Sequence, residues 1–274
     1  MSTRLPTYFI SHGGGPWPYL DGEFRRMFDR LEESIKDIRR ELANEPRAVL
    51  MISGHWEESG FAISSGEKPG MVYDYYGFPE HTYHIRYKAP GSPELAQRVQ
   101  KLLQDGGIPA RLDPERGYDH GTFSIMKPLY PEEDIPLVQL SIDHSYDPQL
   151  HLQLGRLLAP LRDEGVLIIG SGLTYHNLRE MRGSEGFEPS RVFDAWLRKT
   201  LLDAAPAERT SRLVSWERAP LARAAHPRED HLIPLMAALG AAENEPAAVV
   251  YHQKDLMGGI TASSYRFGEV PNAR

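Results

Sequence analysis

Two short stretches of the chain consist entirely of apolar residues, at positions 48–52 and 166–169. A strand with one face in water alternates apolar and polar residues, whereas a strand covered on both faces does not need to. Amphipathic patterns, with apolar residues every three or four positions, occur at residues 21–44, 93–104 and 149–164. Strands that alternate with such helices predict an α/β fold with a mainly parallel central sheet and helices on both faces.

The same periodicities predict the other elements. Further helices are expected at residues 122–130, 190–204 and 229–239, and further strands at 7–10, 61–65, 108–112, 136–142, 247–251 and 260–267. Segment 66–93 has neither periodicity but is rich in tyrosine, glycine and proline, which is typical of a functional loop. No repeat or linker divides the 274 residues, and we expect one domain over residues 1–274.

The composition argues against several classes of function. A formal net charge of −7 and a pI near 5.9 disfavour a nucleic-acid or anionic membrane partner, because both require basic patches. No stretch approaches the roughly 18 apolar residues of a membrane span, and residues 1–6 do not read as a signal peptide. The absence of cysteine excludes disulfides and thiolate ligands, and we expect a cytoplasmic protein.

Three of the eleven histidines follow an apolar strand beside glycine: His12 after residues 7–10, His55 after 48–52, and His176 shortly after 166–169. The carboxyl ends of parallel strands meet at one edge of the sheet, where ligands usually bind. A single histidine in this setting is as often a structural residue as a functional one. Three together favour a metal site, because imidazole is a common ligand of zinc, iron and copper. We expect glycines 13–15 to give clearance to metal and substrate.

A fourth segment, residues 225–235, contains two histidines and two carboxylates near the start of a predicted helix. Glu229 and Asp230 would complement the helix dipole whether or not they bind a metal. His231 is the stronger ligand candidate, whereas His226 is expected at the surface.

His120 lies in a polar turn, directly after Asp119 and just before the helix predicted at residues 122–130. Asp119 is expected to cap that helix, so His120 is either part of a structural turn or a residue that contacts substrate. His151 lies within a helical pattern and is expected to face solvent. The chain has no Gly-x-Ser-x-Gly elbow, which disfavours a serine hydrolase.

Seven motifs occur in order along the chain: SHGGGP at 11–16, SGHW at 53–56, YKAPGSP at 87–93, YDHG at 118–121, VQLSI at 138–142, GSG and HNL at 170–178, and HP and DHLIPL at 226–235. Together they resemble the class III extradiol ring-cleavage dioxygenases. The closest branch is the single-chain DOPA 4,5-dioxygenase type, related to the β subunit of protocatechuate 4,5-dioxygenase. The resemblance implies a catalytic domain with non-haem iron(II) that uses O2 to open a catechol ring to a muconic-semialdehyde-type product.

The resemblance also implies a role for each matching histidine. His12, His55 and His231 match metal ligands. His176 matches an acid/base residue or an additional ligand, and His120 matches a residue that contacts substrate or O2. The protocatechuate branch completes its ligand set with a glutamate, so Glu229 and Asp230 stay candidate ligands.

The implied cofactor is Fe(II), and Zn(II) is able to replace it in the isolated protein because it binds the same donors more tightly. The implied partners are a small catecholic substrate and O2, with no nucleic acid and no membrane. Two alternatives use the same observations differently. One is a zinc-dependent hydrolase built on the same histidines, and the other is a non-catalytic interaction protein that retains the fold.

Overall fold

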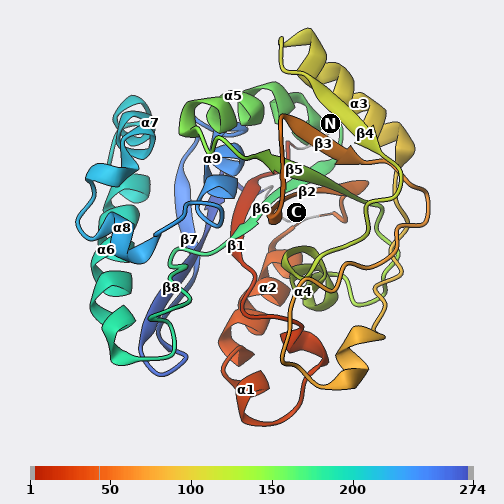
Figure 1. The fold of residues 1–274 in the computed structure, drawn as a ribbon. Helices are drawn as coiled ribbons and strands as arrows, with labels where there is room; N and C mark the ends of the chain where they lie inside the picture. Colours follow the sequence, from red (N-terminus) through yellow and green to blue (C-terminus); the bar gives the residue numbers. More distant parts are fainter. Residues whose placement is uncertain (1–3, 43, 271–274) are drawn as a thin grey trace.

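A computed structural model describes residues 4–42 and 44–270 and places its strands in one mixed sheet (Figure 1). The strand order is β4-β3-β5-β2-β6-β1-β8-β7. Strands β5, β2, β6 and β1 pair in parallel at the centre, whereas β8, β7 and β3 introduce antiparallel pairs. The predicted α/β fold with a mainly parallel central sheet is therefore confirmed. The strands are β1 (Thr7–Ser11), β2 (Ala48–Glu58), β3 (Phe61–Ser64), β4 (Ala110–Asp113), β5 (Leu137–Asp143), β6 (Val166–Gly172), β7 (Ala247–Leu256) and β8 (Ile260–Phe267).

Helices cover both faces of the sheet, as β6 illustrates. Gly170 faces helix α9 (Ile233–Gly240) and Gly172 faces His231 just before it, whereas the Ser171 hydroxyl donates to the Gly121 carbonyl of helix α4 (His120–Leu129), because successive residues of a strand point to opposite faces. The α-helices are α1 (Gly22–Arg26), α2 (Asp29–Glu41), α3 (Pro93–Asp105), α4 (His120–Leu129), α5 (Pro148–Leu158), α6 (Phe187–Leu202), α7 (Pro206–Val214), α8 (Ala222–Ala225) and α9 (Ile233–Gly240). Short 3-10 helices lie at Trp17–Tyr19, Glu80–Tyr83, Ala159–Arg162, Ser184–Gly186 and Trp216–Arg218.

The long helix predicted over residues 21–44 is divided into α1 and α2. Phe28 interrupts it with backbone angles of φ −102° and ψ 7°, and its ring is fully buried against Trp17 at a centroid distance of 5.4 Å. The apolar stripe itself is confirmed beyond the break, because Leu31, Ile35 and Ile38 are buried. Packing of one aromatic side chain therefore ends the helix where the sequence periodicity continues.

Two further differences affect the carboxyl-terminal half. Helix α9 begins at Ile233, so the prediction that a helix starts at residue 229 is wrong. Helices α7 and α8 were not predicted, and α7 buries only Arg209 and Leu213, which leaves little apolar periodicity to detect. Among the residues described, no helix is long and apolar enough to cross a membrane.

Two histidines expected outside the protein interior are fully buried. His151 has no exposed surface; its Nε2 accepts from the Asp143 N–H at 3.1 Å and its Nδ1 donates to the Asp147 carbonyl at 2.8 Å. His226 is also buried, with Nε2 3.0 Å from the Thr174 carbonyl and its ring beside Phe193. Burial lowers the pKa of His151 to about 4, although the hydrogen bond to Asp147 opposes the shift.

The buried His151 makes the fold sensitive to acid. Its pKa is about 4 in the folded protein and about 6.5 when unfolded, so its contribution to stability is complete above pH 6.5 and is lost as the pH falls toward 4. Relative to His151→Gln, the wild-type free energy of unfolding should fall by up to about 3 kcal/mol across that interval. Denaturant unfolding of both metal-free proteins at several pH values checks this, and parallel pH profiles would contradict it.

Candidate metal centre

The first candidate ligand, His12, follows β1 at the carboxyl end of the sheet and is 2% exposed. Its N–H donates to the Gly172 carbonyl at 3.2 Å, and its own carbonyl accepts from Trp17 Nε1 at 2.8 Å. The two hydrogen bonds join the His12 backbone to the end of β6 and to the 3-10 helix that follows β1. The position predicted from the sequence, just past a buried strand, is therefore confirmed.

The glycines that follow His12 lie against aromatic side chains. A Cβ on Gly13, which has φ +79°, would lie 2.7 Å from Trp17 Nε1, and a Cβ on Gly15 would lie 2.4 Å from the Phe78 ring. These glycines give room to aromatic side chains that pack beneath the turn. Packing against aromatic side chains is therefore reason enough for glycine here, and the expectation that glycines 13–15 also clear space for metal and substrate stays a prediction.

His55 lies within β2, not beyond its end as predicted. The pairing of β2 with β5 shifts between Ile52, opposite Leu140, and Glu57, opposite Ile142. Residues 53–56 therefore form a bulge in which His55 leaves the regular ladder. A Cβ on Gly121 would lie 2.8 Å from His55 Cδ2, so this glycine allows α4 to approach the imidazole.

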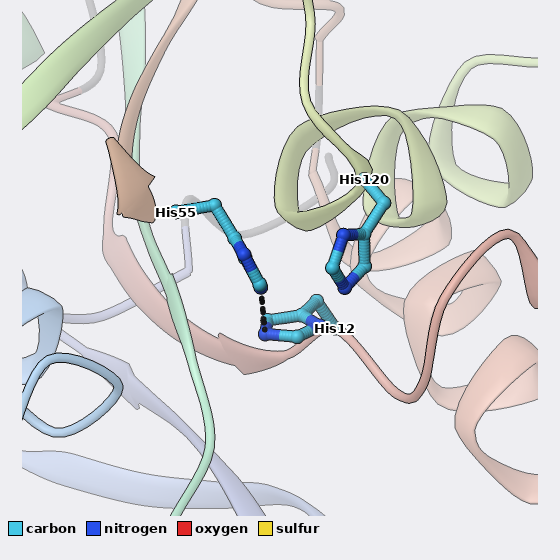
Figure 2. A group of neighbouring side chains, drawn as sticks. All are labelled: His12, His55 and His120. Carbon is cyan, nitrogen blue, oxygen red and sulfur yellow. Dashed lines mark hydrogen bonds between the residues drawn. The ribbon is translucent and has the colours of Figure 1, made fainter. Parts of the chain in front are cut away.

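His120 is the first residue of α4, and Asp119 caps the helix as predicted by accepting from the Thr122 N–H at 3.0 Å. The Asp119 side chain is fully buried and also accepts from Ser53 Oγ at 2.9 Å and from Arg116 at 2.8 Å. The cap is thereby tied to the bulge that carries His55. Figure 2 shows His12, His55 and His120 pointing toward one another from β1, β2 and α4.

His231 reaches the same place from the turn before α9. The Leu173 N–H donates to the His231 carbonyl at 3.0 Å, and a Cβ on Gly172 would lie only 2.0 Å from that carbonyl oxygen. The His176 ring stacks on the His231 ring, with centroids 3.4 Å apart and planes 21° apart. Both imidazoles face Asp230, whose oxygens lie 3.0 Å from His231 Nδ1 and 3.6 Å from His176 Nδ1.

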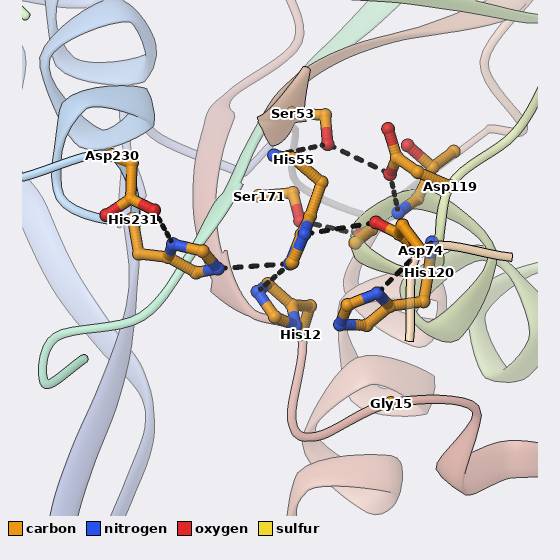
Figure 3. Close-up of polar contacts among 12 residues, drawn as sticks. His12, Gly15, Ser53, His55, Asp74, Asp119, His120, Ser171, Asp230 and His231 are labelled. Carbon is orange, nitrogen blue, oxygen red and sulfur yellow. Dashed lines mark hydrogen bonds and ion pairs between the residues drawn. The ribbon is translucent and has the colours of Figure 1, made fainter. Parts of the chain in front are cut away.

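The Nε2 atoms of three of these histidines have the spacing of metal ligands. His55 Nε2 lies 3.3 Å from His12 Nε2 and 3.0 Å from His231 Nε2 (Figure 3). Two nitrogens that each lie about 2.0–2.1 Å from one ion, at roughly tetrahedral or octahedral angles, are about 2.9–3.4 Å apart. Both distances fall within this interval, so His55 and each of these two partners have the spacing of side chains that share a bound ion.

Two adjacent groups of side chains could bind a metal ion here. His12, His55 and His120 offer ligand atoms that all lie within 4.8 Å of one another, as do His176, Asp230 and His231. The contact between His55 and His231 joins the two sets. The structure therefore brings together all five histidines singled out in the sequence, whereas their individual roles stay predictions.

The electrostatic environment favours the neutral, metal-binding form of His12 and His231 but acts in the opposite direction at His55. Burial lowers the pKa of His12 and of His231 well below the usual value, and the neighbouring imidazoles lower it further. At His55, burial also lowers the pKa, but the hydrogen bond and charge of Asp74 outweigh burial and raise it. Neutral rings with free lone pairs are the form that binds metal ions.

Three carboxylates lie near the centre, and a ligand role for Glu229 or Asp230 stays a prediction. Glu229 forms an ion pair with Arg223 at 2.6 Å, and Asp230 faces the Nδ1 atoms of two histidines on the side away from the converging Nε2 atoms. Asp74, in the long loop after β3, contacts both His55 and His120 but was not identified from the sequence. The aromatic content of its loop was the only available signal.

The sheet edge and its converging imidazoles define a class: an α/β protein with a histidine-lined metal centre. Comparisons with known proteins narrow that class. Residues 6–268 match the family described as the catalytic LigB subunit of aromatic ring-opening dioxygenase. The chain belongs to this family and is an extradiol ring-cleavage dioxygenase.

Individual relatives agree over nearly the whole chain. It is 40% identical to 4,5-DOPA dioxygenase extradiol of Beta vulgaris, covering 95% of this chain and 96% of the relative. It is 33% identical to the protein of the same name from Escherichia coli (strain K12), covering 97% and 96%. A crystal structure of an uncharacterized protein from Escherichia coli K12 matches with a TM-score of 0.78 and 32% identity, covering 97% of this chain and 100% of that one.

Proposed function

We propose that the protein cleaves a catecholic ring beside its two hydroxyl groups, with Fe(II) at the histidine cluster, and incorporates both atoms of O2 into a muconic-semialdehyde-type product. The observation that carries the proposal is the convergence of the His12 and His231 Nε2 atoms within 3.0–3.3 Å of His55 Nε2, in a member of a ring-opening family. The relatives are named as dioxygenases, which favours this function over a hydrolase or an interaction protein.

His12, His55 and His231 are the proposed metal ligands. His55 Nε2 lies 3.3 Å from His12 Nε2 and 3.0 Å from His231 Nε2, whereas the ligand atom of His120 is placed only within 4.8 Å of those of His12 and His55. An iron ion held by these three side chains would leave room for the catechol and O2 and would supply the redox chemistry of ring opening. Nitrogen donors bind zinc more tightly than ferrous iron, so isolated protein is expected to contain zinc unless iron is supplied.

His120 and His176 are the proposed acid/base residues. Catechol binding requires loss of a hydroxyl proton, and ring opening requires a proton donor; imidazole exchanges protons in the suitable pH range. His120 approaches the cluster from α4, with its ring centroid 3.9 Å from that of His55. His176 approaches from the loop after β6 and stacks on His231 without an Nε2 contact of the kind that joins the ligands. We therefore favour acid/base action over metal binding for His176.

Tyr75 is the proposed aromatic wall beside the substrate. Its buried ring lies 5.8 Å from the His120 ring between centroids. Two neighbours in the same loop are less suited to this role: Tyr76 is 92% exposed, and the Phe78 ring rests on Gly15. Only part of the aromatic loop is therefore proposed to face the ring that is cleaved.

Anaerobic reconstitution of the metal-free protein with ferrous iron tests the function. On addition of air and a catechol, we expect O2 uptake equal to the catechol consumed and a yellow semialdehyde product. The panel should begin with DOPA, the compound in the relatives' names, and include protocatechuate and unsubstituted catechol. Protein loaded with zinc is the matched control and should consume no O2, because zinc has no redox chemistry.

Absence of O2 uptake with every catechol in the iron-loaded protein would overturn the proposal. Ester or amide hydrolysis by the zinc-loaded protein, without O2 uptake, would instead favour the hydrolase. The metal content of both preparations must be measured before the assays, so that a missing activity is not a consequence of a missing ion.

A further inference from the structure

One carboxylate contacts two histidines of the metal centre from outside the cluster. Asp74 Oδ2 lies 3.1 Å from His55 Nδ1, and Asp74 Oδ1 lies 2.8 Å from His120 Nδ1 (Figure 3). The same Oδ1 also accepts from the backbone N–H of His120 at 3.1 Å. Although the backbone of Asp74 is at the surface, its side chain is only 19% exposed. The carboxylate thus points inward and joins a proposed ligand to a proposed acid/base residue.

The loop is built to hold Asp74 in this position. Just before it, the Val72 N–H donates to the Tyr118 carbonyl at 2.8 Å and the Tyr118 N–H donates to the Gly70 carbonyl at 2.9 Å. This bridge fastens the loop to the residue that precedes Asp119 and His120 in the chain. Just after Asp74, the buried Tyr75 donates its hydroxyl to the Thr82 carbonyl at 2.5 Å. Fixed backbone on both sides leaves the carboxylate little freedom to move away.

The chemistry of the contact determines where the imidazole hydrogens lie. An ionised carboxylate only accepts hydrogen bonds, so each Nδ1 that contacts it must carry the hydrogen. In a neutral ring the other nitrogen, Nε2, then presents a lone pair. For His55 that lone pair points at the proposed metal, and for His120 it is an acceptor for a substrate hydroxyl. The negative charge stabilises this arrangement in both rings at once.

We infer that Asp74 is a positioning residue that fixes the tautomer and orientation of His55 and His120 together, and so couples metal binding to proton transfer. The part that concerns His120 and substrate rests on the proposed function; the part that concerns His55 and the metal does not. Asp230 lies between His231 and His176 in a similar way, with contacts of 3.0 Å to His231 Nδ1 and 3.6 Å to His176 Nδ1. Each aspartate thus serves one proposed ligand and one proposed acid/base residue.

Asp74→Asn tests the inference, because an amide can accept from one Nδ1–H but presents its NH2 group to the other. Outer hydrogen bonds to metal-bound histidines are typically worth about 10–100-fold in metal affinity. We expect the dissociation constant for zinc, measured by competition with a chelator, to rise by about that factor. In nitrogen-15 NMR spectra of the metal-free protein at mildly alkaline pH, His55 or His120 should lose its Nδ1–H tautomer.

Glu80→Gln is the matched control. Glu80 belongs to the same loop and contacts His84 Nε2 at 3.1 Å, but both side chains are exposed and lie outside the cluster. Its removal should leave zinc affinity and the two tautomers unchanged. Asp74→Ala, which removes the acceptor without adding a donor, should weaken zinc binding in the same direction as Asp74→Asn.

Wild-type zinc affinity in both Asp74 variants, or unchanged tautomers in Asp74→Asn, would overturn the inference. Loss of zinc affinity with normal unfolding of the metal-free variant supports positioning, since a purely structural role would lower stability instead. These measurements use no catechol and no O2. If even the iron-loaded wild type cleaves no catechol, the proposed function fails, but the inference about Asp74 and His55 is still decided by zinc binding and NMR.

Discussion

Replacing His55 with alanine should remove metal binding and catechol cleavage together. His55 contributes the central nitrogen of the cluster, because its Nε2 is the atom within 3.3 Å of His12 and 3.0 Å of His231. We expect zinc affinity to fall by more than the roughly 100-fold upper cost of losing an outer hydrogen bond. O2 uptake by iron-reconstituted protein should be undetectable, and equilibrium zinc binding and oxygen consumption are the measurements.

The control for this substitution is His144→Ala. His144 also follows a strand, β5, but it is exposed and its Nδ1 lies 2.9 Å from the Glu58 carbonyl, outside the cluster. This variant should bind zinc and consume O2 as the wild type does. A His55→Ala protein that retains one tightly bound zinc ion, or equal losses in the two variants, would show that the ligand set is assigned incorrectly.

Much of the fold could be predicted from periodicity because the central strands are buried on both faces. Residues 48–52 and 166–169 are fully or almost fully buried in β2 and β6, as their unbroken apolar character requires. Boundaries were less predictable, because tertiary contacts decide them. Phe28 ends a helix by packing on Trp17, and α9 begins late because residues 230–232 pack against β6 before the helix starts.

The location of the candidate site could also be predicted, since histidines at the ends of parallel strands meet at one edge. What no local pattern indicates is the partner of each imidazole. Asp74 is 19 residues beyond His55 and 46 before His120, and the loop between carries no periodicity. The bulge that turns His55 inward depends equally on pairing with β5, a contact that is distant in sequence.

The glycines beside the histidines show the same dependence on distant contacts. Glycines also occur in β2 and β6, where the chain that carries His231 comes close. A Cβ on Gly54 would lie 2.9 Å from the Asp230 carbonyl, one on Gly170 would lie 2.3 Å from the Pro234 carbonyl, and one on Gly172 would lie 2.0 Å from the His231 carbonyl. These glycines let the segment that carries His231 lie directly on the sheet.

Gly172→Ala should therefore impair the metal centre without altering any side chain in it. Since carbon atoms do not approach a carbonyl oxygen as closely as 2.0 Å, the His231 backbone must move by about 1 Å or more. A misplacement of about 1 Å at a catalytic site costs about 100-fold in rate. We expect zinc affinity to fall at least 10-fold, kcat/KM for the catechol to fall about 100-fold, and stability to fall by about 1–3 kcal/mol through overpacking.

Gly70→Ala is the control, because a Cβ there meets nothing within 4 Å and its φ is not positive. Zinc titration, steady-state O2 uptake and denaturant unfolding of both variants separate the two effects of Gly172→Ala. If overpacking alone matters, the variant loses stability but binds zinc as tightly as the wild type, and the placement of His231 by β6 is then unimportant to the centre. If weak zinc binding persists under conditions where the variant is fully folded, the close approach of β6 to His231 is what sets the third proposed ligand in place.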